Sequence, residues 1–253
     1  MLFTAGPAAG LGLRPALVLS ELALVAPGLI LAALLRRPLM ETLALEAPLR
    51  QVSLLSLGFG ATLWLASLGL FEVQYSLWSP PPGYLEAFQR LHEALRPHGP
   101  ADALVSLLAI AIAPAACEEV LFRGLVLPAF LRPLGAWGAA CASALLFGLI
   151  HLDFASGGLS LYRVPFAAVV GLGLAALRLR AGALGPAILA HAALNAITFG
   201  AAPFADDPSQ GLPDPRPALG LLLFAAGAAA TLGLLRRFQP GTARLPAPGP
   251  ERS

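Results

Sequence analysis

The feature that most constrains this chain is a series of long apolar segments that are almost free of charged residues. A helix needs about 20 mostly apolar residues to cross the hydrocarbon core of a bilayer. Seven segments meet this length within a few residues, and they are 16–35, 52–71, 101–131, 134–151, 164–179, 183–199 and 217–235. A break of the third segment at Pro114 or Pro128 would raise the count to eight. The segments predict a polytopic membrane protein.

The predicted fold class is all-α, a bundle of transmembrane helices. Strands of membrane barrels alternate apolar and polar residues in short segments, whereas these segments are continuously apolar. Hydrophobic residues make up 57% of the chain and charged residues only 12%, with a mean hydropathy of +0.76. A soluble domain carries about a quarter charged residues. A nucleic-acid partner is not expected either, because the chain has no Lys and its arginines are scattered.

The arginines beside the segments fall on one side of the bilayer if the chain crosses it seven times. They are Arg36, Arg37, Arg50, Arg132, Arg178, Arg180, Arg236, Arg237, Arg244 and Arg252. The other side receives the polar linker 72–100 and an acidic loop with Asp206, Asp207 and Asp214. Cytoplasmic loops carry an excess of basic residues. We therefore expect the C-terminus in the cytoplasm and the N-terminus outside.

Composition divides the chain into four parts. Residues 1–100 hold the first two segments and the polar linker, 101–200 the core with polar motifs, and 201–238 the acidic loop and last segment. The tail 239–253 is rich in Pro, Gly and Arg and is expected to be disordered. Within the linker, the breaker 79–83 precedes an amphipathic stretch at 84–95. That stretch predicts a helix on the membrane surface.

Ionisable residues inside apolar segments cost roughly 2.5–3.5 kcal/mol each on insertion scales, so each needs a reason. Glu119 and Arg123 lie four residues apart in the third segment and can form an ion pair. Glu118 is rotated by about 100° from Glu119 and cannot use that arginine as directly. The unpaired Glu118 is therefore a candidate for catalysis. Glu21 is isolated in the first segment, and we expect it to face the bundle interior or the headgroups.

Two further polar pairs lie in later segments. Phe147 and His151 share one helix face, and so do His191 and Asn195. A lone His near the end of a span is as often an interfacial side chain as a functional one. By the helical rise, Glu118, His151 and His191 lie about 21, 28 and 16 Å above the arginine side. Helix tilt can bring such depths together, so we expect Glu118, His151, His191 and Asn195 to line one polar cavity.

The motifs together resemble those of the CPBP family, which comprises the type II CAAX prenyl endopeptidases and bacteriocin-processing relatives, also called Abi proteins. Each motif is short, but the three follow one another in order on successive apolar segments. They are Glu118-Glu119-x-x-x-Arg123, Phe147-x-x-x-His151 and His191-x-x-x-Asn195. The resemblance covers about Leu104–Thr198 and implies an intramembrane peptidase.

The resemblance also implies a role for each motif residue. Glu118 would be the general base that activates water, with His151 as its partner, and His191 and Asn195 would form the oxyanion site. The residues at positions that hold the site together are Glu119, Arg123 and Phe147.

The same atoms leave a metal-based alternative open. Glu118, His151 and His191 form a His₂Glu set with an open position for water, as in catalytic zinc sites. The chain has no His-Glu-x-x-His helix. We expect catalysis without a metal or other cofactor, with zinc bound to these three residues as the alternative.

Two other functions use the same features. A non-enzymatic bacteriocin-immunity or scaffolding protein would keep the fold, but it gives no reason for an intact set of motif residues. A transporter would use the carboxylates as a proton relay, but no inverted repeat is visible. We expect an endopeptidase of the bacterial inner membrane that acts on peptide or protein substrates in or at the lipid bilayer.

Overall fold

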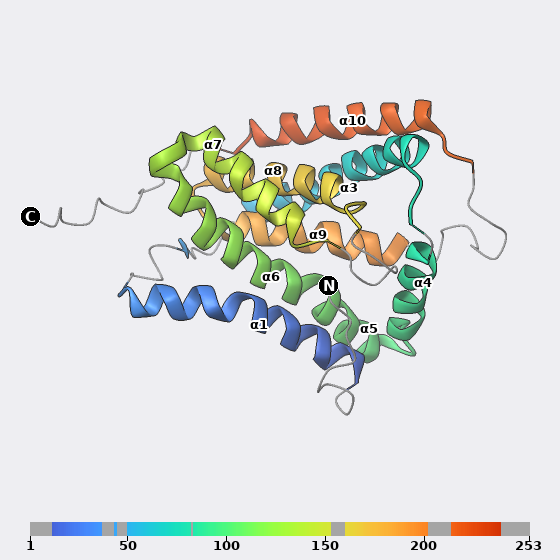
Figure 1. Ribbon diagram of the computed structural model, residues 1–253, viewed down its shortest axis with the longest axis horizontal. Coiled ribbons are helices and arrows are strands. Elements are labelled where there is room, and N and C mark those ends of the chain that lie inside the picture. Colours follow the sequence, from blue (N-terminus) through green and yellow to red (C-terminus); the bar gives the residue numbers. More distant parts are fainter. Residues whose placement is uncertain are drawn as a thin grey trace, which may run out of the picture.

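The computed structural model describes residues 12–36, 43–44, 50–81, 83–152, 160–201 and 214–238. These residues form a bundle of helices that contains no β-strand, so the all-α fold class is confirmed for them (Figure 1). In chain order the elements are α1 (Leu13–Leu34), α3 (Arg50–Leu77), α4 (Tyr84–Leu95), α5 (Pro100–Leu107), η1 (Leu108–Ile112), α6 (Ala113–Glu119), η2 (Val120–Val126), α7 (Leu127–Leu149), α8 (Val164–Ala181), α9 (Gly185–Ala201) and α10 (Pro217–Leu235).

Five helical runs in the described residues are long and apolar enough to cross a membrane. They are Leu13–Leu34, Gln51–Leu77, Pro100–Leu149, Val164–Ala181 and Pro217–Leu235. The predicted third and fourth spans share the single run of 50 residues, and α9 is apolar but only 17 residues long. The predicted count of seven spans is therefore not confirmed.

The helix does not break at Pro114 or Pro128, which the sequence left as possible ends of the third span. The π-helical segment η1 lies immediately before the helix that contains Pro114, and η2 lies immediately before the one that contains Pro128. Proline removes a hydrogen-bond donor from an α-helix and crowds the preceding turn. Wider π-helical turns change the bonding register at these points, so α5, η1, α6, η2 and the start of α7 form one continuous helix.

The chain reverses direction inside α7. Gly135 has φ 67° and ψ 179°, and it divides α7 into two helices. Only glycine adopts this backbone conformation without steric cost. Figure 1 shows the two arms of α7 meeting in a sharp bend at one end of the bundle. The bend lies next to the boundary at 131–134 that the sequence predicts between the third and fourth segments.

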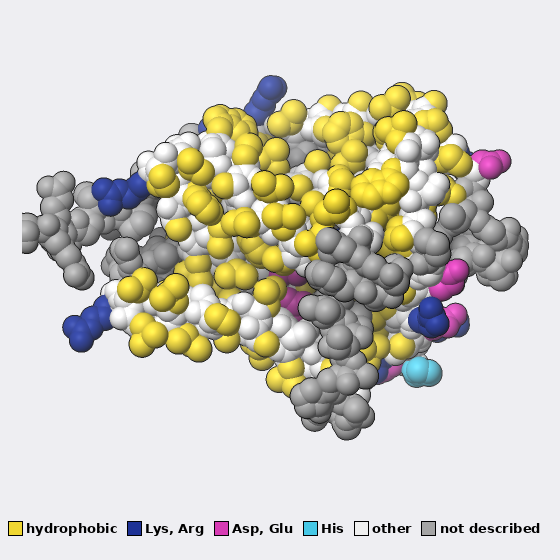
Figure 2. Space-filling model, viewed as in Figure 1, with side chains coloured by type: hydrophobic (Ala, Val, Ile, Leu, Met, Phe, Trp, Pro, Cys, Tyr) yellow, Lys and Arg dark blue, Asp and Glu magenta, His cyan; other side chains and the backbone are white. Residues whose placement is uncertain are grey.

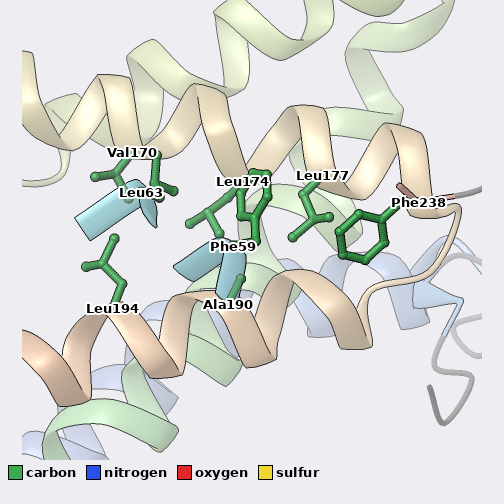
Figure 3. Packing of buried hydrophobic residues seen from close by; sticks show 8 residues of the cluster. All are labelled: Phe59, Leu63, Val170, Leu174, Leu177, Ala190, Leu194 and Phe238. Carbon is green, nitrogen blue, oxygen red and sulfur yellow. The ribbon is translucent and has the colours of Figure 1, made fainter. Parts of the chain in front are cut away.

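A central hydrophobic cluster lies where α3, α8 and α9 meet (Figure 3). Phe59 and Leu63 of α3 project between Leu174 of α8 and Leu194 of α9, and all four side chains are buried. The helices approach closely because small residues lie between them. A Cβ atom on Gly173 would lie only 2.8 Å from Leu63 Cδ1. This cluster fixes α8 and α9, which carry part of the site described below.

The outer surface of the bundle is apolar. Figure 2 shows hydrophobic side chains over most of one face, with basic side chains at both ends and most of the visible acidic and histidine side chains at the right-hand end. Exposed fractions reach 75% at Leu34, 82% at Leu77 and 69% at Leu222. Soluble monomers rarely expose such continuous apolar surface, whereas lipid is a suitable solvent for it. The chain is an integral membrane protein.

The polar linker contains the helix predicted at 84–95. This helix, α4, follows Gly83, which has φ 77°. Leu95 is buried against the bundle, whereas Glu86 and Glu93 are exposed. Its position relative to a lipid surface stays a prediction. The tail 239–253 and the acidic residues Asp206 and Asp207 lie outside the described residues.

Candidate active site

Glu119 and Arg123 form a fully buried ion pair in the middle of the bundle. Arg123 Nη1 donates a hydrogen bond of 2.7 Å to Glu119 Oε1, and both side chains have 0% exposure. Arg123 Nη2 donates a second hydrogen bond of 2.8 Å to the carbonyl oxygen of Gly171 on α8. The contact that the four-residue spacing predicts is therefore present. Arg123 also connects η2 to α8, which the spacing alone does not indicate.

His191 of α9 joins this pair and also faces Glu118. Its Nδ1 atom lies 3.0 Å from Glu119 Oε1. Because a carboxylate oxygen accepts, Nδ1 carries the hydrogen and donates it. On the other side of the ring, Nε2 lies 3.7 Å from Glu118 Oε2. That distance is too long for a direct hydrogen bond, so a short gap separates the two polar atoms.

The two neighbouring glutamates therefore differ in their surroundings. Glu119 has 0% exposure and receives hydrogen bonds from both Arg123 and His191 through one oxygen. Glu118 has 7% exposure and its one close polar contact in the described residues is the longer one to His191. The sequence distinguished the two residues through Arg123 alone. It did not indicate that Glu119, rather than Glu118, holds His191.

Phe147 packs at the centre of the cluster. Its ring lies 5.8 Å from the ring of His191 and 4.8 Å from that of His151. The guanidinium carbon of Arg123 lies 4.6 Å from the Phe147 ring centroid, within the range of a cation–π contact. Gly171 allows this packing, since a Cβ atom there would lie 3.1 Å from Phe147 Cδ1.

His151 lies just beyond the end of α7, and Phe147 separates it from His191. Its Nδ1 atom is 2.8 Å from the carbonyl oxygen of Phe147. A carbonyl oxygen only accepts, so Nδ1 donates and Nε2 keeps its lone pair. His151 is half-buried and makes no hydrogen bond or ion pair with Glu118 in the described part of the chain.

Asn195 lies one helical turn after His191 on α9 and is half-buried. Among the described residues it has no hydrogen-bond partner, so its amide can bind another molecule. The structure thus brings Glu118, Glu119, Arg123, His191 and Phe147 into contact. It places His151 and Asn195 beside this group without joining either of them to Glu118.

Glu21 of α1 is a member of the site that the sequence did not place there. It is buried, with 3% exposure, and lies within the electrostatic range of Glu118 and His191. In the sequence, the one signal at Glu21 is a charged residue inside an apolar segment. The side chain faces the bundle interior, as expected. No motif linked it to the core.

The described residues contain no group of three His, Cys, Asp or Glu side chains placed to hold a metal ion. Phe147 contacts both histidines of the proposed His₂Glu set, and Nδ1 of His191 is already bound to Glu119. In the described part of the chain, Glu118, His151 and His191 do not form a three-ligand site, and catalysis without a metal stays a prediction. Metal dependence stays a question for experiment.

The polar cluster lies inside the part of the chain that matches a known family. Residues 100–197 match the family model of the type II CAAX prenyl endopeptidase Rce1-like proteins, a peptidase family. No curated protein and no solved structure matches the chain. The matched segment includes η1, α6, η2, α7 and α8 in full, together with all three polar motifs. This match supports the resemblance of residues 100–197 to the CPBP family of type II CAAX prenyl endopeptidases.

Proposed function

We propose that the protein is an intramembrane endopeptidase in which Glu118 activates water. The substrates are membrane-associated peptides or proteins, prenylated or secreted, that reach the site from the bilayer. The single observation that carries the assignment is the contrast between the two glutamates. Glu119 Oε1 accepts hydrogen bonds from both Arg123 and His191, whereas Glu118 faces a gap of 3.7 Å to His191 Nε2.

Glu118 is suited to removing a proton from water. It has 7% exposure, so a small molecule can reach it. Arg123 donates its hydrogen bonds to Glu119 and Gly171 and not to Glu118. A carboxylate that is not bound to an arginine remains available to accept a proton. The same group can return that proton to the departing amine once the C–N bond breaks.

His191 and Asn195 are suited to stabilising the oxyanion. Glu119 fixes the ring of His191 through Nδ1. A buried carboxylate orients a catalytic histidine in the same way, and in the protonated form of the ring Nε2 also carries a hydrogen. His191 Nε2 then points toward Glu118 and can donate to a substrate oxygen. The amide of Asn195, one turn away, adds a second donor of the kind found in oxyanion sites.

His151 is assigned as the partner of Glu118 in handling water. Its Nδ1 is held by the Phe147 carbonyl, so its free Nε2 can accept a hydrogen bond from water. Water between His151 and Glu118 would connect the two, because no direct contact does. Phe147 keeps the two histidines apart and contacts Arg123.

The topology proposal rests on the charge distribution. Described arginines lie near the end of α1, at the bend of α7, at the end of α8 and after α10, and Figure 2 shows basic side chains toward that end of the bundle. We assign that end to the cytoplasm by the excess of basic residues in cytoplasmic loops. The C-terminus would then lie in the cytoplasm of a bacterial cell.

The test compares Glu118→Gln with the wild type in cleavage of fluorogenic peptides by detergent-purified protein. Glutamine keeps the shape of the side chain but cannot accept the proton, so the rate should fall about 10²–10⁴-fold. The melting temperature should change little. Glu93→Gln is the matched control, since Glu93 is exposed on α4, away from the site.

Three outcomes would revise the proposal. Full activity of Glu118→Gln would remove this residue from the base role. Loss of wild-type activity in a chelator, restored by added zinc, would favour the metal alternative over the metal-free one. A protein that cleaves no peptide in any form would favour the scaffolding alternative.

A further inference from the structure

Glu21 is buried on the face of α1 that packs against the bundle. The buried residues of α1 are Leu17, Glu21, Val25 and Ala32, which lie along one stripe of the helix. Apolar residues explain the rest of this stripe, but a carboxylate in their place costs energy inside a membrane. The Glu21 side chain has 3% exposure, and its Oε2 atom has no hydrogen-bond partner in the described residues.

Contacts on either side of Glu21 fix its position against the site. Nearer the start of α1, Arg14 contacts Asp102 at 2.8 Å and Ser106 at 2.9 Å. Nearer the end, a Cβ atom on Gly28 would lie 2.9 Å from Leu125 Cδ1. α1 therefore runs parallel to the helix that starts at Pro100. Glu21 lies between these two contacts and beside the stretch that contains Cys117 and Glu118.

The charged neighbours of Glu21 agree with this placement. The helix α1 packs against α6, which carries Cys117, Glu118 and Glu119. The nearest arginine of the cluster, Arg123, is bound to Glu119 and to the carbonyl of Gly171. Glu21 thus has no arginine partner in the described residues, unlike Glu119.

A few acidic side-chain atoms reach the surface of the bundle beside α1. Figure 2 shows acidic atoms at the surface between α1 and the helices that lie above it in the view. Glu21 lies eight residues after the first residue of α1, about 12 Å along the helix axis. A basic side chain would enter from the side of α1 on which the acidic atoms are visible, because its aliphatic part tolerates an apolar wall.

We propose that Glu21 forms a substrate subsite that binds a basic side chain, Lys or Arg, close to the scissile bond. The inference rests on the proposed peptidase function and names its substrate class. The substrate ammonium or guanidinium group would supply the missing partner of Glu21 Oε2. Glu118 would stay free for water, since the substrate cation is bound by the neighbouring carboxylate. The subsite comes from α1, outside the matched residues 100–197.

The first experiment needs no variant. Peptides that carry one Lys at successive positions around the cleavage site are compared with peptides that carry norleucine there. The wild type should cleave the Lys peptide faster at one position, by about 10- to 100-fold in kcat/KM, as expected for a hydrogen bond to a charged group. Equal cleavage at every position would overturn the subsite, while leaving the peptidase proposal intact.

The second experiment uses Glu21→Gln and Glu21→Leu. Both variants should lose the preference for Lys, so that kcat/KM becomes similar for the Lys and norleucine peptides. Leucine suits the apolar surroundings of α1, so this variant should fold even if glutamine does not. Ser20→Ala is the matched control on α1, because Ser20 is exposed and bonds only its own helix.

The outcomes separate the possible roles. A Lys preference that survives in Glu21→Leu would overturn the proposal. An equal loss of kcat on both peptides would also overturn it, because Glu21 would then act on the chemistry and not on recognition. If the wild type cleaves neither peptide, the proposed function itself fails.

Discussion

Two regions of this bundle hold their helices together in different ways. Around Glu119, Arg123 and His191, buried charges are paired, and hydrogen bonds link η2 to α8 and α9 to α6. Between α3 and α10, contact is made through small residues, among them Gly69, Gly220 and Gly227. Small residues that let backbones approach closely are the usual means of packing helices in lipid.

The difference indicates which region serves function. Close packing of glycines is sufficient to hold α3 against α10. The same kind of packing could also hold the helices around Glu119. Buried ion pairs are no better for stability than apolar packing of the same volume. The chain nevertheless keeps two glutamates, an arginine and a histidine in contact in one place. The free-energy cost of burying these charges indicates a role in catalysis. The α3–α10 region shows the kind of packing that stability alone requires.

The largest stability effect should come from breaking the buried ion pair. Arg123→Met leaves Glu119 charged and without its main partner, so the free energy of unfolding should fall by about 3–5 kcal/mol. Arg236→Met is the control, because Arg236 is exposed at the end of α10. Unfolding in detergent, followed by tryptophan fluorescence, measures both variants.

The double variant Glu119→Gln with Arg123→Met tests whether the two residues stabilise the protein as a pair. If the two residues act as a pair, its loss of stability should be smaller than the sum of the two single losses. Additive losses would mean that each residue is needed for a separate contact.

The second effect should come from filling the α3–α10 contact. A Cβ atom on Gly227 would lie 2.8 Å from the Cα of Ala66, so no side chain fits without moving a helix. Gly227→Leu should therefore destabilise the protein by about 1–3 kcal/mol, the range for overpacking. Gly233 of α10 has open space around it and provides the control, Gly233→Leu. Equal stability of the two variants would contradict close packing at Gly227.

A smaller effect is expected within the core region. Ser143 of α7 is buried, and its hydroxyl donates a hydrogen bond of 3.2 Å to the carbonyl oxygen of Phe122 on η2. Ser143→Ala should cost about 1 kcal/mol, the usual net value of one hydrogen bond. Ser67→Ala is the control, because Ser67 bonds a carbonyl of its own helix. Peptidase activity of Ser143→Ala should remain, which also tests whether Ser143 is a nucleophile.

The helices of the bundle followed from the sequence, because apolar length and turn residues act locally. Pro100, Gly182 and Pro217 mark helix ends at the places that backbone chemistry predicts. The continuous helix through Pro114 could not be predicted from the sequence, because a π-helical turn depends on how neighbouring helices pack. The number of membrane crossings likewise stays open, since α9 is short for its apolar character.

The ion pair of Glu119 with Arg123 was predictable for the same local reason, a spacing of one helical turn. The hydrogen bond from His191 to Glu119 was not, since it depends on the rotation of α9 about its own axis. Helix depth placed both glutamates at a level that His191 can reach, but depth does not say which one it faces. The sequence did not indicate Glu21 as a site residue, because α6, the helix against which α1 packs, is distant in the sequence.

The smallest predicted effect concerns the α3–α10 region. Thr231 Oγ1 of α10 donates a hydrogen bond of 2.9 Å to Thr62 Oγ1 of α3. Interhelical hydrogen bonds in membranes average only about 0.6 kcal/mol, because the separated helices find other partners. Thr231→Val should therefore lower the free energy of unfolding by about that amount. Thr198→Val is the matched control, since Thr198 bonds Leu194 of its own helix. A loss of several kcal/mol at Thr231 would mean that hydrogen bonding, and not glycine packing, holds α10 to α3, and the contrast with the core would no longer stand.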